Sequence, residues 1–238
     1  MRYSVKDLVN EDASLISRRC GSDPHVYALE KAGIFARSWL FLGHESQIRA
    51  PGDFVQAYMC ETPIILSRGQ DGAVHATVNS CTHRGLPVCR ADHGNTRRFV
   101  CPYHNWSYTV EGELVSIPQE SEVQRKPDKR QLGLKRVPRV ESWRGMIFGS
   151  FDEHIIGLDD YLGDMRFYLD AFFDRFPAGI EFMGAPHRWV INANWKLPVE
   201  NQLGDVNHGA FLHSAIVPRE AQDVIEALGH SVVTTPGH

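Results

Sequence analysis

The fold is decided by Cys81-Thr82-His83-Arg84-Gly85 and, after a spacer, Cys101-Pro102-Tyr103-His104-Asn105-Trp106. Each segment offers one thiolate and then one imidazole, and 17 residues separate His83 from Cys101. In a [2Fe–2S] cluster that has two Cys on one iron and two His on the other, each segment can give one ligand to each iron. Gly85 suits a tight turn of the chain over the sulfurs, and Trp106 offers an apolar wall against solvent. The pattern therefore predicts a two-iron cluster held on two loops.

A structural zinc site is the alternative for the same four side chains. Zinc is commonly bound by two Cys and two His in tetrahedral geometry. Zinc fingers of the common type place both Cys before both His, whereas this chain alternates them. The alternation favours the two-iron cluster.

The two segments resemble the cluster loops of Rieske non-haem iron oxygenases, the large subunits of bacterial ring-hydroxylating dioxygenases. Rieske proteins of respiratory chains carry an additional disulfide between the two loops. This chain has Leu86 and Tyr103 at those positions, so the resemblance is to the oxygenase or ferredoxin type. Asn105 stands where the family usually has Gly. Because Asn tolerates positive φ better than most residues, we expect the turn to be preserved.

A second group of candidate site residues follows Trp195. Asn201, Asp205 and His208 are spaced to share one helical face, and His213 follows five residues after His208. Two His and a carboxylate form the facial triad of non-haem Fe(II) oxygenases. A spacing of five is about 140° around a regular helix, so the helix must loosen near Gly209 for both His to reach one metal.

This segment resembles the mononuclear-iron helix of the same oxygenase family. The resemblance implies that His208 and His213 bind Fe(II) and that Asp205 links His208 to His104 of a neighbouring subunit, with Asn201 on the same face. Asn207 departs from the family's usual Tyr. The family's third iron ligand is a carboxylate farther along the chain, and none after His213 matches it. We therefore interpret the chain as the N-terminal part of a longer subunit, and we expect it to be inactive alone.

The expected fold class is α+β, a small antiparallel β Rieske domain followed by the start of an α+β helix-grip catalytic domain. Residues 1–37 are assigned to an N-terminal helical segment of the catalytic domain, 38–156 to the Rieske domain and 157–238 to the truncated catalytic domain. Helical patterns occupy 23–38 and the region from 158 onward. Strands are predicted at Phe54–Met59, Ile64–Ser67, Val74–Val78, Phe99–Val100, Trp106–Val110, Met146–Phe151 and Arg188–Ile191, with hairpin turns at 69–72 and 111–113.

Composition limits the classes of partner. The 238 residues carry a net charge of −4 and show no basic stripe, which argues against nucleic acid. No apolar run approaches a membrane span, and the N-terminus does not resemble a signal peptide. Two of the five cysteines are candidate ligands, and Cys20, Cys60 and Cys89 are expected to be free thiols in a reducing cytoplasm.

Nucleotide-binding motifs are absent from the sequence, so electrons must come from another protein. The resemblance, strongest to naphthalene-dioxygenase-like large subunits, implies a reductase with or without a ferredoxin, and NAD(P)H acts only through that reductase. It implies O₂ activation and (di)hydroxylation of an aromatic compound, in a homotrimer that often carries a small β subunit. The alternatives are a Rieske-type electron-transfer protein without oxygenase activity and a zinc-stapled binding module.

Overall fold

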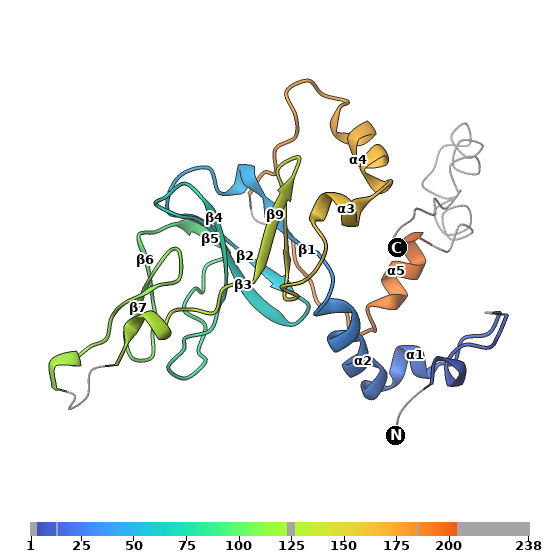
Figure 1. The fold of residues 1–238 in the computed structure, drawn as a ribbon, viewed down its shortest axis with the longest axis horizontal. Coiled ribbons are helices and arrows are strands. Elements are labelled where there is room, and N and C mark those ends of the chain that lie inside the picture. Colours follow the sequence, from blue (N-terminus) through green and yellow to red (C-terminus); the bar gives the residue numbers. More distant parts are fainter. Residues whose placement is uncertain (1–3, 13, 123–126, 185, 204–238) are drawn as a thin grey trace. The chain divides into compact units, whose positions relative to one another are not determined.

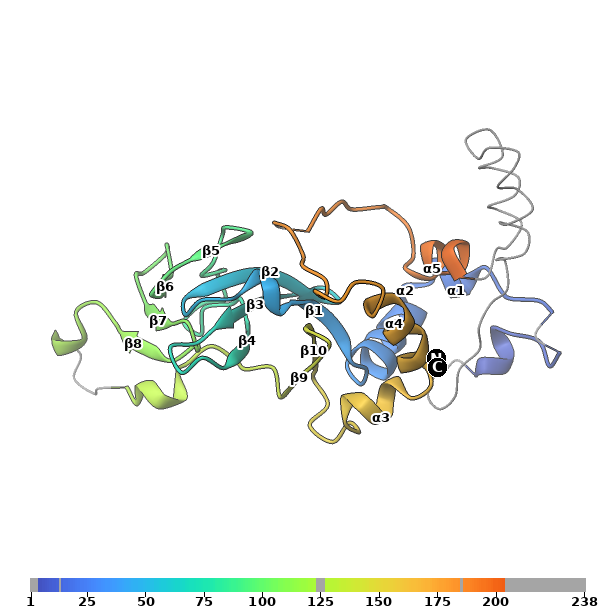
Figure 2. The same ribbon diagram turned by 90° about the horizontal axis from the view of Figure 1, so that it is seen from above.

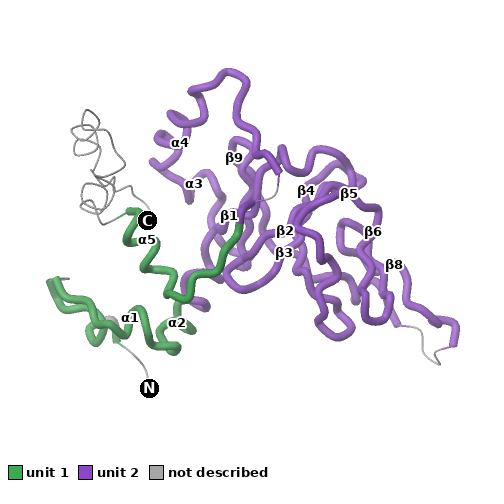
Figure 3. Tube along the Cα trace, turned by 180° about the vertical axis from the view of Figure 1, so that it is seen from behind, with its two compact units in different colours: residues 1–30, 188–238 green, residues 31–187 purple. Residues whose placement is uncertain are grey.

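The computed structural model describes residues 4–12, 14–122, 127–184 and 186–203. Its contacts divide the chain into two compact units, one of residues 31–187 and one of residues 1–30 with 188–238 (Figure 3). Within the described ranges, every strand belongs to the unit of residues 31–187.

Three antiparallel sheets build the larger unit (Figures 1 and 2). The central sheet has the strand order β4-β3-β2-β5, a small sheet has the order β6-β7-β8, and a third has the order β1-β10-β9. The bounds are β1 Leu40–His44, β2 Asp53–Met59, β3 Thr62–Arg68, β4 Val74–Val78, β5 His93–Asn95, β6 Arg98–Val100, β7 Ser107–Thr109, β8 Leu114–Ser116, β9 Arg139–Trp143 and β10 Met146–Ser150.

The central sheet separates two hydrophobic cores. Ile64, Ile65 and Leu66 are consecutive in β3 and have no exposed surface. Ile64 and Leu66 pack in the core shared with β1 and β10. Ile65 packs in the other core, which contains Cys81 and Cys101. Because side chains of a strand alternate between faces, this continuous apolar run fits a strand that is covered on both sides.

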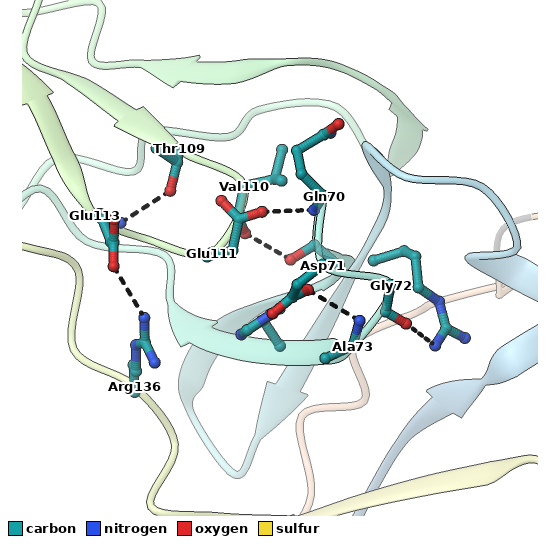
Figure 4. Close-up of polar contacts among 12 residues, drawn as sticks. Gln70, Asp71, Gly72, Ala73, Thr109, Val110, Glu111, Glu113 and Arg136 are labelled. Carbon is teal, nitrogen blue, oxygen red and sulfur yellow. Dashed lines mark hydrogen bonds and ion pairs between the residues drawn. The ribbon is translucent and has the colours of Figure 1, made fainter.

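Polar contacts join the turn after β3 to the turn after β7 (Figure 4). The Ser67 hydroxyl donates to the carbonyl of Val110 at 2.7 Å, and the N–H of Gln70 donates to Glu111 Oε1 at 2.6 Å. Gly112 has φ +92°, and a Cβ there would lie 2.8 Å from Thr77. These contacts tie the central sheet to the small sheet. Both predicted hairpin turns are confirmed.

Two short helices follow β10, α3 from Leu158 to Leu162 and α4 from Met165 to Phe173. The N–H of Leu158 at the start of α3 donates to Glu141 Oε2 from β9 at 2.8 Å, so a strand side chain satisfies a free helix donor. Gly163, at φ +48°, interrupts the helical run that the sequence suggested. Arg144 forms ion pairs with Asp170 and Asp174, which hold α4 against the β9–β10 turn.

The smaller unit contains α1 (Arg19–Ser22), α2 (Pro24–Glu30) and α5 (Lys196–Leu203). Pro24 opens α2, and the Asp23 carboxylate accepts from the N–H of His25 at 2.9 Å. Glu30 at the end of α2 accepts from Trp195 Nε1 at 2.9 Å and pairs with Lys196 Nζ at 2.5 Å. The chain just before and at the start of α5 is thereby held to the end of α2.

The α+β fold class is confirmed, and so are the strands predicted between residues 54 and 151, with bounds shifted by one or two residues. The predicted strand Arg188–Ile191 is wrong, because this stretch has no regular structure. Val190 is 99% exposed, and no strand pairing is found for the stretch among the described residues. An extended segment becomes a strand only with a hydrogen-bonding neighbour. None of the helices in the described ranges is long and apolar enough to span a bilayer.

Candidate metal centre

The two candidate ligand loops leave two different sheets and meet at one core. Cys81 follows β4 of the central sheet, and Cys101 lies between β6 and β7 of the small sheet. Both sulfurs belong to the same hydrophobic core, and each cysteine is only 3% exposed. The fold therefore brings together the two cysteines that the sequence suggested as ligands of one iron.

The backbone of the two loops follows one repeated pattern. The N–H of Gly85 donates to the carbonyl of Cys81 at 2.7 Å, and the N–H of Asn105 donates to the carbonyl of Cys101 at 2.9 Å. Each cysteine N–H in turn donates to the carbonyl five residues later, at 2.9 Å in both loops. Gly85 has φ +78° and Asn105 has φ +55°. The expectation that Asn105 preserves the turn is confirmed.

The two imidazoles contact one another edge to face. The ring centroids of His83 and His104 lie 4.6 Å apart. His83 stacks on Trp106 at 4.9 Å with 6° between the planes, and Tyr103 packs on His104 at 3.8 Å. Trp106 thus forms the apolar wall that the sequence indicated.

One ring nitrogen shows that this geometry fits a metal cluster. His104 Nδ1 is buried and has no hydrogen-bond partner among the described residues. Buried polar atoms are normally paired, and a metal ion would supply the partner that this nitrogen lacks. The pKa of His83 is lowered because neighbouring protein atoms partly desolvate its charged form, although the residue is exposed, and because His104 and Arg84 lie nearby. A lowered pKa favours the neutral imidazole, which is the form that binds metal.

A hydroxyl network contacts one of the sulfurs. Tyr108 is fully buried, and its Oη lies 3.1 Å from Cys81 Sγ and 3.0 Å from Thr82 Oγ1. Thr82 Oγ1 donates to the carbonyl of Leu132 at 2.7 Å. The pKa of Tyr108 is raised far above its ordinary value by burial and by the contact with Cys81, so the phenol keeps its proton.

Asn79 forms hydrogen bonds with the end of the first loop. This role was not predicted from the sequence. Its Oδ1 accepts from the N–H groups of Val88 and Cys89, at 2.9 and 3.0 Å, and its Nδ2 donates to the carbonyl of Cys89 at 2.8 Å. Gln56 Nε2 reaches the carbonyls of Cys89 and Ala91, at 3.2 and 3.0 Å. These partners lie apart in the chain and form no spaced motif, so no signal in the sequence could have revealed them.

The remaining cysteines and the second group of residues stand as follows. None of the five cysteines forms a disulfide, as expected for Cys20, Cys60 and Cys89. Burial raises the pKa of Cys89, which fits an unreactive structural thiol. Asn201 lies on α5. The candidate residues 205, 208 and 213 lie outside the described residues.

No group of three or more His, Cys, Asp or Glu in the described ranges is arranged to hold one metal ion. This is compatible with a Rieske-type cluster, in which only two protein side chains bind each iron.

Comparison with known proteins identifies the centre. The family model of the Rieske [2Fe-2S] domain matches residues 38–131, which include all four candidate ligands. The chain carries a Rieske [2Fe-2S] domain. This match decides between the two metal sites that the ligand set allowed, in favour of the two-iron cluster over zinc.

Relatives extend the similarity well beyond the Rieske domain. The chain is 41% identical, over 99% of its length, to the large oxygenase component of the naphthalene 1,2-dioxygenase system of Pseudomonas aeruginosa. It is 42% identical, over 86% of its length, to the benzene 1,2-dioxygenase subunit alpha of Pseudomonas putida. It covers 52% of the first relative and 45% of the second, so it spans about half their length. The chain is thus homologous to ring-hydroxylating dioxygenase large subunits.

Solved structures agree with the sequence comparison. A naphthalene 1,2-dioxygenase with indole bound in the active site matches 99% of this chain with a TM-score of 0.85 at 40% identity, and the match covers 53% of that protein. The naphthalene 1,2-dioxygenase from Rhodococcus sp. matches 85% of the chain with a TM-score of 0.78 at 43% identity, and the match covers 46% of that protein. The resemblance inferred from the ligand loops is confirmed.

Proposed function

We propose that this chain is the cluster-bearing part of a terminal oxygenase large subunit. In the proposal, electrons received at the Rieske centre serve a mononuclear non-haem Fe(II) that activates O₂ to hydroxylate or dihydroxylate an aromatic ring compound. The observation that carries the proposal is the joining of two matched ligand loops over one core, in a chain homologous to dioxygenase large subunits along nearly its whole length.

The four candidate ligands have separate tasks in this proposal. Cys81 and Cys101 hold one iron through buried sulfurs, and His83 and His104 hold the other as neutral imidazoles. When bound, the cluster supplies one-electron transfer at a potential raised by the two neutral ligands. Trp106 and the buried core keep water from the sulfurs, and Tyr108 offers an O–H to Cys81. Tyr103 and Pro102 are exposed next to His104.

The second centre rests on the resemblance of the segment after Trp195. His208 and His213 would bind Fe(II), and Asp205 would connect His208 to His104 of a neighbouring subunit. Asn201 on α5 would lie on the same helical face as Asp205. The third, carboxylate ligand has no candidate in this chain. The domain division at residues 37 and 156 remains part of the proposal.

Electron donors and other subunits are proposed from the same relatives. Their names describe a component of a system and a subunit alpha, so these relatives work with other proteins. We propose a reductase, with or without a ferredoxin, as the donor for this chain, so that NAD(P)H acts only indirectly. A homotrimer, with or without a small β subunit, would place the cluster of one subunit near the iron of the next.

The test of the cluster is low-temperature EPR of purified protein before and after dithionite reduction. We expect a rhombic signal on reduction, with the low average g value of a mixed His and Cys ligand set. Cys101→Ser should abolish the signal, whereas Cys20→Ser, at a cysteine outside the unit that carries the cluster loops, should leave it unchanged. A colourless protein that contains zinc would contradict the cluster.

The oxygenase part needs a separate measurement. Reduced protein is incubated with O₂ and naphthalene or benzene, as this chain and as the chain extended to the length of its relatives. Product from the extended chain, lost in His208→Ala, would support the proposal. A normal cluster signal with no iron bound at the second centre in the extended chain would leave an electron-transfer protein instead.

A further inference from the structure

The hydroxyl network beside the cluster loops holds fewer protons than it has acceptors. Tyr108 Oη is within hydrogen-bonding distance of both Cys81 Sγ, at 3.1 Å, and Thr82 Oγ1, at 3.0 Å. Thr82 Oγ1 also lies 2.7 Å from the carbonyl oxygen of Leu132. Tyr108 has no exposed surface, so water cannot complete the network from its side.

Counting the protons fixes the direction of each hydrogen bond. A carbonyl oxygen only accepts, so the short contact to Leu132 commits the single hydroxyl proton of Thr82. Toward Tyr108, Thr82 can then act only as an acceptor. A cysteine that binds iron is a thiolate and also only accepts. The single Tyr108 proton therefore has two acceptors, Thr82 Oγ1 and Cys81 Sγ, at nearly equal distances.

We propose that Thr82 is a positioning residue that draws part of the Tyr108 hydroxyl proton away from Cys81 and thereby lowers the reduction potential of the cluster. Hydrogen bonds to cluster sulfurs raise that potential, because they stabilise the more negative reduced state. Thr82, anchored by Leu132, weakens the one such bond that this side chain network can supply. The inference rests on the proposed binding of a [2Fe–2S] cluster by Cys81.

A simpler role for Thr82 is to support Tyr108, and this role predicts a change in reduction potential of the opposite sign. If Thr82 only supports Tyr108 in place, removal of its hydroxyl would loosen the tyrosine and lower the potential. If Thr82 competes, removal frees the whole Tyr108 proton for Cys81 and raises it. The sign of the shift in potential separates the two roles, and a Thr82 hydroxyl with no influence on the Tyr108 proton would leave the potential unchanged on removal.

The experiment is a redox titration of cluster-loaded protein at one pH, followed by visible absorbance. Thr82→Val keeps the shape of the side chain and removes the acceptor. At the midpoint potential of the unaltered protein, we expect the ratio of reduced to oxidised cluster to rise about threefold, as for partial strengthening of one hydrogen bond. Tyr108→Phe should lower the ratio, and Thr82→Ser, which keeps the hydroxyl, should match the unaltered protein.

The double variant supplies the decisive comparison. Tyr108→Phe has no hydroxyl proton to share, so adding Thr82→Val to it should not change its potential. A fall in potential for Thr82→Val, an unchanged potential, or a rise that persists in the Tyr108→Phe background would overturn the inference.

Two further points keep the test decisive. Thr82→Val leaves the Leu132 carbonyl without its donor, which costs stability. If that variant cannot retain the cluster, Thr82→Cys replaces it, and because a thiol is the weaker acceptor its potential should also rise. Failure of the unaltered protein to show a reducible chromophore would instead contradict the proposed cluster, which is a separate outcome from a cluster whose potential ignores Thr82.

Discussion

Asn105 occupies the position in the second loop that Gly85 occupies in the first, and both have positive φ. A side chain in left-handed backbone costs about 1–2 kcal/mol, less for Asn. We expect Asn105→Gly to leave the protein as stable or slightly more stable, and Asn105→Ala to lose about 1 kcal/mol. Thermal loss of the visible cluster absorbance measures both.

The first loop offers the matched comparison for this strain. A Cβ at Gly85 would meet only Ser80 Oγ at 3.8 Å, so Gly85→Ala tests backbone strain without a clash. We expect it to lose about 1–2 kcal/mol. Equal stability of Gly85→Ala and the unaltered protein would show that the turn tolerates other backbone angles.

The side-chain amide of Asn79 supplies hydrogen-bond partners for backbone groups at the end of the first loop. Asn79→Ala leaves the N–H groups of Val88 and Cys89 without partners in a buried site and removes one of the two side-chain donors to the Cys89 carbonyl. We expect a loss of about 2–4 kcal/mol in the free energy of unfolding, measured by urea denaturation. Asn95→Ala, which removes side-chain hydrogen bonds from an exposed position, should cost under about 1 kcal/mol. Similar losses for the two variants would refute the bracing role.

At the scale of elements, Glu111 joins two hairpins and makes their contact sensitive to acid (Figure 4). Burial acts to raise its pKa, but hydrogen bonds from Gln70 and Thr109 outweigh burial and lower the pKa below the ordinary 4.5. A carboxyl with a lowered pKa stabilises the fold above its unfolded pKa, and that stabilisation is lost as the pH falls through its folded pKa. Glu111→Gln should therefore be less stable than the unaltered protein near neutral pH. Its free energy of unfolding should fall less than that of the unaltered protein when the pH is lowered.

The measurement is urea unfolding between about pH 7 and about pH 3. Glu113→Gln is the matched control, because Glu113 is exposed in the same turn and its ion pair with Arg136 spans 3.7 Å. Such pairs contribute little, so this variant should follow the unaltered protein at every pH. A Glu111→Gln curve parallel to that of the unaltered protein would mean that Glu111 has no part in the acid response.

Strands could be predicted from the sequence where burial requires a recognisable pattern of apolar residues. β3 is a continuous apolar run and was predicted. β9, at the edge of its sheet, reads Arg-Val-Glu-Ser-Trp, and β5 reads His-Gly-Asn, so neither carries an apolar signal. The pairing partner of β5 is β2, which lies much earlier in the chain, whereas β9 pairs with β10 directly after it. The Arg188–Ile191 stretch shows the reverse error, since its apolar residues imitate a strand that has no described partner.

At the scale of the molecule, the four candidate ligands could be singled out in the sequence because each loop carries its own Cys and His close together. The residues that tune or brace them could not. Tyr108 reaches Cys81 across 27 positions, and Thr82 reaches Leu132 across 50, so only the folded sheets bring them together. The spacing of residues within a loop indicates candidate ligands, whereas the packing of residues far apart in the chain determines the surroundings of those ligands.

The central sheet separates a core that holds the cluster loops from a core that does not, and Ile64 and Ile65 face opposite sides of it. Both are fully buried, so Ile64→Val and Ile65→Val should each lose about 1 kcal/mol in the free energy of unfolding. Only Ile65→Val leaves its cavity in the core of Cys81 and Cys101. We therefore expect release of iron to a chelator, in native buffer, to accelerate in Ile65→Val and to stay near the original rate in Ile64→Val. Equal release rates at equal loss of stability would mean that iron leaves through global unfolding and that the two cores act as one.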